Sequence, residues 1–97
     1  MMAKTPEGIV KKQIMQILAE HNAYYVTPMS FGFGNSGVPD VIAVVKGRFI
    51  GIEAKAGKNK PTALQLKNLQ DIRESGGIAL VINEHNLDEL REALNVL

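Results

Sequence analysis

Two acidic residues flank a segment that has the sequence of a β-hairpin. Asp40 and Glu53 are separated by twelve residues, and Lys46-Gly47 at the centre is a candidate two-residue turn. With that turn, facing positions have numbers that sum to 93, so Asp40 lies opposite Glu53. Facing Cβ atoms are about 4.5 to 5.5 Å apart. Two negative charges there repel by about 3 kcal/mol at an effective dielectric constant of about 20, so we expect a partner that offsets the repulsion.

A divalent cation is one such partner, because Mg²⁺ and Mn²⁺ bind one or two carboxylates together with water and substrate phosphate. Lys55 follows Glu53 by two residues and points to the same side of the strand. Two acids beside an ammonium group suit hydrolysis of a phosphodiester. Three alternatives stay open: a solvated acid pair that takes up a proton, a surface ion pair between Glu53 and Lys55, and a bulged turn that shifts the register.

Two further polar residues lie on helical stripes that are otherwise apolar. Glu7 is in the first turn of a helix expected over about residues 6–21, and Gln65 is in a helix expected over about 63–75. Each could help to complete the site. Favourable charge at the helix N-terminus also accounts for Glu7. A capping box formed by Thr62 and Gln65 accounts for Gln65, and considered alone it is the favoured interpretation.

The pattern along the chain predicts the elements that position these residues. Thr5-Pro6 is typical of a helix start, and Asn86 is expected to cap a last helix with a leucine stripe at Leu87, Leu90, Leu94 and Leu97. The run 78–82 is apolar on both faces, which indicates a strand in the centre of a sheet. The expected order is α-β-β-β-α-β-α. The expected strands are 24–26, 38–45, 48–56 and 78–82.

Length and composition exclude several classes of protein. The 97 residues, 45% hydrophobic and 22% charged, predict a single domain over 1–97. The absence of cysteine excludes disulfides and thiolate metal sites. The longest solid apolar run has five residues, far short of a membrane span, and the first residues lack a signal-peptide pattern. We expect a cytoplasmic protein without a membrane segment.

The charge is unevenly distributed, although the net formal charge is only +1. Residues 46–67 carry six basic side chains against one acid, which gives this segment +5. A segment of this kind can attract a polyanion, although it is more often a solvated loop. The candidates for contact with a nucleic-acid backbone are Lys46, Arg48, Lys58 and Lys60.

The glycine-rich run 32–37 spells G-x-G-x-x-G, but it does not predict a dinucleotide site. That fingerprint requires a helix directly after it, whereas Pro39 and a β-branched run follow here. We therefore expect no nucleotide cofactor. The segment 29–37, with Met29, Phe31 and Phe33, is expected to be a loop beside Asp40 that meets a partner subunit or DNA, or that has no such role.

Taken together, these motifs resemble the VRR-NUC family of the PD-(D/E)XK nuclease superfamily, of the stand-alone type found in phages and bacteria. The resemblance is carried by Gly37-Val38-Pro39-Asp40, Glu53-Ala54-Lys55, Gln65 and the preceding Glu7, and it covers about residues 5–83. It implies an α/β fold with a restriction-endonuclease-like αβββαβ core, in which helices flank a mixed central sheet, and this chain adds a C-terminal helix.

The resemblance also implies roles for individual residues. Asp40, Glu53 and the backbone carbonyl of Ala54 would bind Mg²⁺ or Mn²⁺, with Glu7 a further candidate that acts through water. Lys55 would assist the attacking water. The implied catalytic residues are Asp40, Glu53, Lys55, Glu7 and Gln65.

The function implied is that of a metal-dependent, structure-selective DNA endonuclease. Stand-alone members are similar to Holliday-junction resolvases, so a homodimer that cuts four-way junctions in recombination, repair or phage DNA metabolism is expected. The alternative is a DNA-binding or scaffold protein that keeps the fold without cutting. Retention of an acid pair that repels disfavours this alternative.

Overall fold

The structure is a computed structural model that describes residues 5–29 and 37–97. Over these residues the chain forms a four-stranded sheet and three helices, in the order that the sequence predicts. The elements are α1 (Pro6–Glu20), β1 (Tyr24–Val26), β2 (Val41–Val45), β3 (Arg48–Ala54), α2 (Ala63–Glu74), β4 (Ile78–Ile82) and α3 (Leu87–Asn95).

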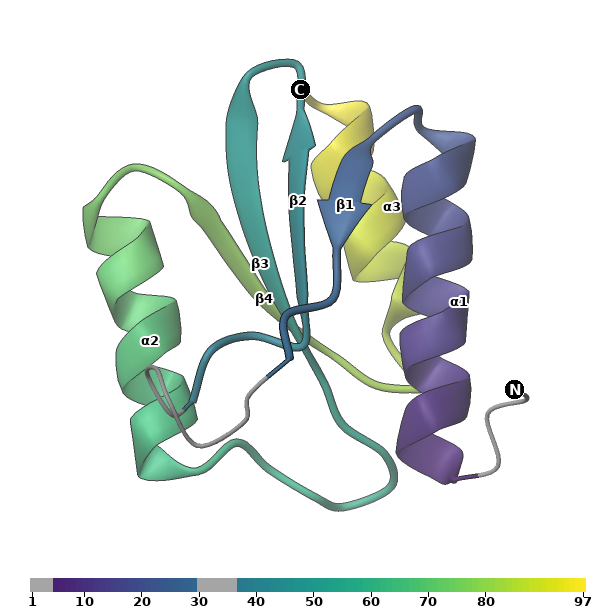
Figure 1. Cartoon of the computed structure of the whole chain (residues 1–97). Helices are drawn as coiled ribbons and strands as arrows, with labels where there is room; N and C mark the ends of the chain where they lie inside the picture. Colours follow the sequence, from purple (N-terminus) through teal and green to yellow (C-terminus); the bar gives the residue numbers. More distant parts are fainter. Residues whose placement is uncertain (1–4, 30–36) are drawn as a thin grey trace.

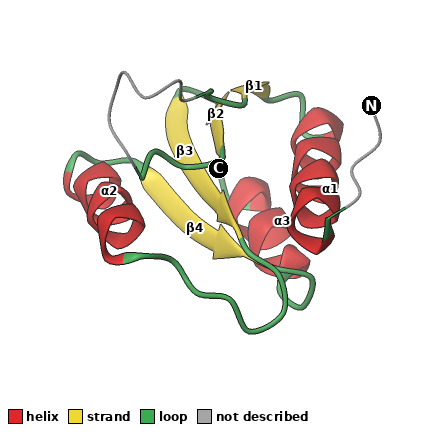
Figure 2. Cartoon of the chain, turned by 60° about the horizontal axis from the view of Figure 1, so that its bottom comes forward, coloured by secondary structure: helices red, strands yellow, loops and turns green. Residues whose placement is uncertain are grey.

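The sheet is mixed, and its strands follow one another in the order β1-β2-β3-β4. The pairs β1–β2 and β2–β3 are antiparallel, whereas β3 and β4 are parallel because α2 connects them. Helices α1 and α3 cover one face of the sheet, and α2 lies against the other (Figures 1 and 2). None of the helices in the described parts of the chain is long and apolar enough to cross a membrane.

The β2–β3 hairpin has the register predicted from the sequence. Lys46 and Gly47 both have positive φ, 51° and 80°, as a type I′ turn requires. Val45 pairs with Arg48, and each further pair keeps the sum of 93. The hairpin therefore contains no bulge. One position beyond the last ladder pair, Val41 with Ile52, the same register places Asp40 next to Glu53.

Both strands of this hairpin are shorter at their site end than the expected 38–45 and 48–56. Pro39 has no N–H to donate to a ladder. The Asp40 side chain then takes the place of a backbone partner, because its Oδ2 accepts a hydrogen bond from the Ala54 N–H at 2.9 Å. The regular strands accordingly begin at Val41 and end at Ala54.

The prediction that strand 78–82 lies in the centre of the sheet is wrong. β4 is an edge strand that pairs with β3. It is apolar on both faces because α2 packs on one face and α3 on the other. Burial by two helices and burial between two strands select the same residue types, so the pattern does not distinguish them.

The core lies between the sheet and the pair α1 and α3. Thr5 caps α1 through a hydrogen bond from the Gly8 N–H to its Oγ1 at 2.9 Å. Asn86 stands at the N-cap of α3, as expected, but its side chain bonds to Asn83, Val81 and Glu89 instead of capping the helix. The leucine stripe belongs to this core: Leu90 and Leu94 are buried, and Leu87 and Leu97 are partly buried against the core cluster.

Two glycines let α2 approach the other face of the sheet. A Cβ on Gly51 would lie 2.6 Å from Ile72 Cδ1, and a Cβ on Gly77 would lie 2.8 Å from Ile72 Cγ2. The side chain of Ile72 therefore occupies space that any other residue at either position would fill. The helix ends in a Schellman motif, in which Gly76 has φ 94° and the Gly77 N–H donates to the Ile72 carbonyl.

Candidate active site

The acid pair lies where β2 begins and β3 ends. Asp40 directly precedes β2, and Glu53 is the penultimate residue of β3. The hydrogen bond from the Ala54 N–H holds the Asp40 carboxylate against the end of β3. Because β3 and β4 are parallel, the loops that follow them leave from this same end of the sheet. Ligands of α/β sheets commonly bind at this end.

Glu53 is the only charged residue in the buried interior of the described chain. It is 1% exposed. Its Oε1 is fully buried and has no hydrogen-bond partner among the described residues. An unpaired buried carboxylate oxygen is costly unless a proton or a cation satisfies it. Among the described residues, the atom therefore marks a position that a proton or a cation can satisfy.

The surroundings of Glu53 raise its pKa to about 8, and the largest cause is burial. A hydrogen bond with the Asp40 carboxyl group and the negative charge of Asp40 raise the pKa further, and the charge of Glu7 adds to this. Lys55 opposes them and lowers the pKa. Without a bound cation, Glu53 consequently keeps its proton at neutral pH.

Lys55 lies on the same side of the strand as Glu53, as the alternation predicts. Its Nζ is 3.7 Å from Glu53 Oε2, and its side chain is only 12% exposed. The ammonium group is therefore held beside the carboxylate pair and does not extend freely into solvent. A solvent-exposed ion pair, one of the alternatives for this lysine, does not fit such burial.

Glu7 reaches the site through its charge. It lies in the first turn of α1, and its charge contributes to the raised pKa of Glu53. However, across residues 5–29 and 37–97 no three acidic, histidine or cysteine side chains are grouped closely enough to hold a metal ion. The protein therefore offers a pair of carboxylates, and Glu7 does not lie with them as a third direct ligand.

Gln65 serves the capping box. Its Oε1 accepts from the Thr62 N–H at 2.9 Å, and its own N–H donates to Thr62 Oγ1 at 3.2 Å. Both described hydrogen bonds of Gln65 thus stabilise the start of α2. The geometry brings Asp40, Glu53 and Lys55 together, and it assigns Gln65 to the helix.

The four basic residues proposed for nucleic-acid contact fall into two groups. Lys58 and Lys60 are exposed in the loop after β3, at the end of the sheet that holds Glu53. Lys46 and Arg48 lie at the hairpin turn, at the opposite end of β3. At about 3.3 Å per residue, Arg48 is about 16 Å from Glu53 along the strand. The two side chains at the turn bond to the backbone carbonyls of Leu97 and Gly76. The +5 segment is therefore not one surface, because the hairpin separates its two halves.

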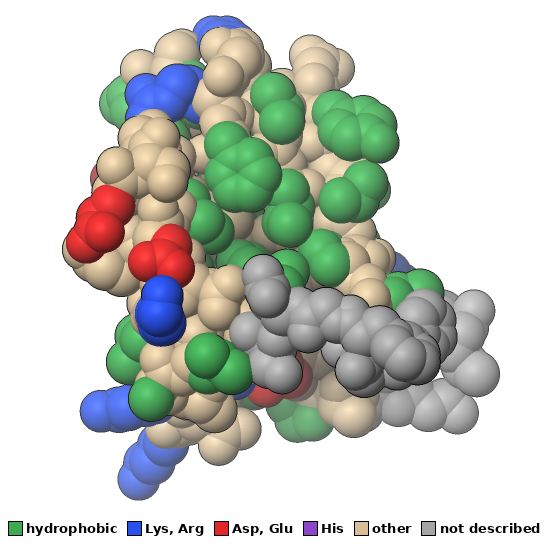
Figure 3. Space-filling view, turned by 60° about the vertical axis from the view of Figure 1, so that its left-hand side comes forward, with side chains coloured by type: hydrophobic (Ala, Val, Ile, Leu, Met, Phe, Trp, Pro, Cys, Tyr) green, Lys and Arg blue, Asp and Glu red, His purple; other side chains and the backbone are tan. Residues whose placement is uncertain are grey.

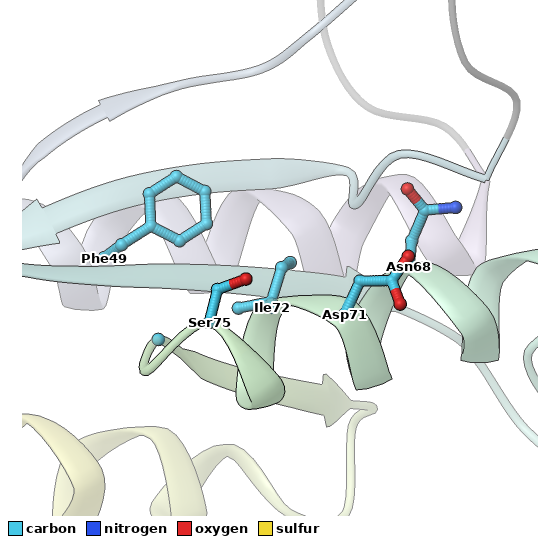
Figure 4. A pocket seen from close by; sticks show the side chains of 6 residues that line it. Phe49, Asn68, Asp71, Ile72 and Ser75 are labelled. Atoms are coloured by element: carbon cyan, nitrogen blue, oxygen red, sulfur yellow. The ribbon is translucent and has the colours of Figure 1, made fainter.

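A pocket of about 460 Å³ lies between α2 and β3 (Figure 4). It is distinct from the acid pair, because no predicted catalytic residue lines it. Asp71 is the one ionisable lining residue, and it is ion-paired to Lys67 at 2.9 Å. The pocket therefore offers no comparable chemistry. Its lining residues are Phe49, Asn68, Asp71, Ile72, Ser75 and Gly77.

An apolar surface that the sequence analysis did not identify lies beside this pocket. Because α2 covers only the β3–β4 side, hydrophobic side chains gather on the open part of the sheet (Figure 3). Tyr24 pairs with Val44, and Val44 pairs with Phe49, so the three form a row across three strands. We call Tyr24, Val26, Val44 and Phe49 the open sheet face; they are 72%, 42%, 41% and 40% exposed.

The segment 29–37 lies mostly outside the described residues. Met29 is 75% exposed. Phe31, Phe33 and most of the glycine pattern lie outside the described residues.

Comparison with known proteins identifies the fold. A solved structure described as a VRR_NUC domain superposes with a TM-score of 0.74 and 20% sequence identity, over 95% of this chain and 97% of that chain. No protein-family model matches the sequence. No curated protein is significantly similar to it. The chain thus has the fold of the VRR-NUC domain along almost its whole length, which confirms the expected architecture.

Proposed function

We propose that this protein is a metal-dependent DNA endonuclease that hydrolyses phosphodiester bonds in branched DNA. The observation that carries the proposal is the buried Oε1 of Glu53, which has no hydrogen-bond partner within residues 5–29 and 37–97 and lies beside the Asp40 carboxylate and the Lys55 ammonium group. A scaffold without catalytic activity has no use for such an arrangement, because it destabilises the fold. The VRR-NUC fold supports the same function.

The donor set fits Mg²⁺ or Mn²⁺. Both are hard cations that accept one or two carboxylates and fill the other positions with water and substrate phosphate. Asp40 and Glu53 would supply the carboxylates, and the backbone carbonyl of Ala54 would be a third protein ligand. When bound, such an ion would polarise the scissile phosphate and lower the pKa of a coordinated water.

The residues of the chain have separate roles in this proposal. Asp40 is fixed by the Ala54 N–H, so its carboxylate needs little rearrangement on binding. Lys55 would orient the attacking water and stabilise negative charge that develops on the phosphate. Glu7 would act at longer range, through its charge or through a water molecule. Gln65 would act indirectly, by holding the start of α2.

The substrate would lie across the end of the sheet that holds these residues. Lys58 and Lys60 are exposed there and can contact backbone phosphates. Lys46 and Arg48 lie at the other end of β3 and bond to backbone carbonyls, so they would contribute less. The proposed DNA surface is therefore the loop 55–62.

We further propose that the active species is a homodimer that pairs through the open sheet face. The four side chains of that face carry no charge, so they offer no ion pair to a phosphate backbone. An uncharged row of aromatic and branched side chains is instead typical of a protein interface. A second copy supplies both an identical apolar row and the second active site that symmetric cutting of a four-way junction requires.

A cleavage assay tests this function. The purified protein would be incubated with a synthetic four-way junction, a flap, a duplex and single-stranded DNA, each with Mg²⁺, Mn²⁺ or EDTA. We expect paired symmetric nicks in the junction that need metal and are lost in Asp40→Asn. Binding of the junction without cleavage under every metal condition would instead identify a non-catalytic DNA-binding protein.

A further inference from the structure

The loop after β4 reaches the loop after β3 through one carboxylate. Both oxygens of Glu84 accept a hydrogen bond from the Gly57 N–H, each at 3.0 Å. The two residues are 27 positions apart in the sequence. His85 Nε2 lies 4.0 Å from Oε2, which is beyond hydrogen-bond distance. Glu84 thus contacts the backbone of the loop that carries Lys58 and Lys60.

The contact holds a tight turn. The Asn59 N–H donates to the Ala56 carbonyl at 3.1 Å, which closes a turn over residues 56–59. Gly57 lies inside this turn with φ +60°, a conformation that favours glycine. Ala56 is 7% exposed and anchors one side of the turn in the protein. Glu84 fixes the Gly57 amide next to it, and Lys58 is the exposed charged residue of the turn.

The charge of Glu84 is stabilised by this geometry. Hydrogen bonds from its own backbone N–H and from the Gly57 N–H lower the pKa of the carboxyl group. Hydrogen bonds to an ionised acceptor are stronger than neutral ones. The carboxylate therefore remains an acceptor for the loop amide at neutral pH.

We propose that Glu84 is a positioning residue for DNA: it clamps the turn 56–59 so that Lys58 faces the phosphates of the strand that enters the active site. This inference rests on the proposed function, since it assigns to the clamp the task of ordering a DNA contact. Without the clamp, the loop would lose order before binding, and DNA would have to restore it.

Simple electrostatics predicts the opposite result, which makes the proposal easy to test. An acidic residue beside a phosphate-binding loop repels DNA, so removal of the Glu84 charge alone should tighten DNA binding. Loss of the hydrogen bond to Gly57 should weaken DNA binding. Glu84→Ala removes both the charge and the hydrogen-bond acceptor, whereas Glu84→Gln removes the charge but keeps an oxygen for the Gly57 N–H.

The experiment measures binding of a fluorescent four-way junction in EDTA, where no cleavage can occur, over a range of salt concentrations. We expect Glu84→Ala to bind about 3- to 10-fold more weakly than wild type and to lose about one phosphate contact from the salt slope. Glu84→Gln should bind at least as tightly as wild type. Glu92→Ala removes an exposed acid from α3 and should leave binding unchanged. Equal or tighter binding by Glu84→Ala would overturn the proposal.

Amide hydrogen exchange separates the clamp from the DNA function. The Gly57 amide should be protected in wild type and exchange faster in Glu84→Ala, with the core strands unchanged. If the Gly57 amide is unprotected in wild type, there is no clamp and the inference is wrong. If it is protected but wild type does not bind DNA, both the positioning role and the proposed function fail, although the contact itself is real.

Discussion

The Ala54 N–H donates a hydrogen bond to Asp40 Oδ2 at 2.9 Å, which ties the start of β2 to the end of β3. The same bond holds one carboxylate beside the buried Glu53 side chain. Pro39 has no N–H to continue the ladder beyond Asp40, and the Ala54 N–H bonds to the Asp40 side chain. A structural bond and a candidate catalytic geometry therefore share the same atoms.

The raised pKa of Glu53 predicts how stability depends on pH. In the unfolded chain the carboxyl has a pKa near its ordinary value of 4.5, whereas in the fold it is about 8. Between these values the folded state binds more protons, so stability falls as pH rises from about 4.5 through about 8. One pKa unit corresponds to about 1.4 kcal/mol, so the loss is of the order of a few kcal/mol.

Replacement of Glu53 by glutamine should remove this pH dependence. In EDTA, Glu53→Gln should unfold at a higher temperature than wild type above about pH 8 and differ little from it near pH 4.5. Thermal unfolding followed by circular dichroism at several pH values measures both curves. Parallel curves for the two proteins would show that Glu53 is not buried as described.

The basic loop and the basic hairpin end offer a matched pair of double variants. Lys58→Ala/Lys60→Ala should weaken junction binding by about tenfold or more and reduce the salt slope by about two. Lys46→Ala/Arg48→Ala removes the same charge from the other end of the sheet and should change the affinity by less than about threefold. Anisotropy titrations at several salt concentrations decide. Equal losses would show that DNA contacts both ends of the sheet and would contradict a surface confined to the loop 55–62.

The packing of α2 should be sensitive to a single added methyl group. Gly51→Ala places a Cβ 2.6 Å from Ile72 Cδ1 and 3.1 Å from Pro39 Cγ, so it should cost about 1 to 3 kcal/mol. Adding Ile72→Val removes Cδ1 and should recover part of the loss. Denaturant unfolding of the single and double variants measures the coupling, and additive losses would argue against this contact.

The open sheet face predicts the oligomeric state. Val44→Glu places a charge in the row of Tyr24 and Phe49 and should convert a dimer into a monomer that no longer makes paired nicks. Val96→Glu makes the same change at a residue that is 83% exposed on the other side of the sheet, and the dimer should persist. Light scattering at micromolar concentration gives the masses. A wild-type monomer, with and without junction DNA, contradicts the interface.

Much of this fold follows from short patterns. Lys46-Gly47 sets the hairpin register, and Thr5 and Thr62 cap their helices as expected. Each of these features depends on residues within a few positions of one another. For the same reason the sequence predicts that Asp40, Glu53 and Lys55 share one side of the hairpin.

Other features depend on distant parts of the chain, and the sequence did not predict them. The edge position of β4 follows from burial by two helices, which has the same apolar signature as a central strand. The separation of Lys46 from Lys58 follows from the length of β3, which a linear count of charges ignores. The bond between Glu84 and Gly57 leaves no local signal, because each residue is unremarkable among its own neighbours.

Single-turnover cleavage of a four-way junction tests whether Glu53 is catalytic. Wild type, Glu53→Gln and the control Glu92→Gln would be compared with Mn²⁺ at enzyme concentrations that saturate the DNA. We predict that Glu53→Gln binds the junction but cuts it at least about 100-fold more slowly, while Glu92→Gln matches wild type. Cleavage by Glu53→Gln within about threefold of the wild-type rate would contradict the proposed site.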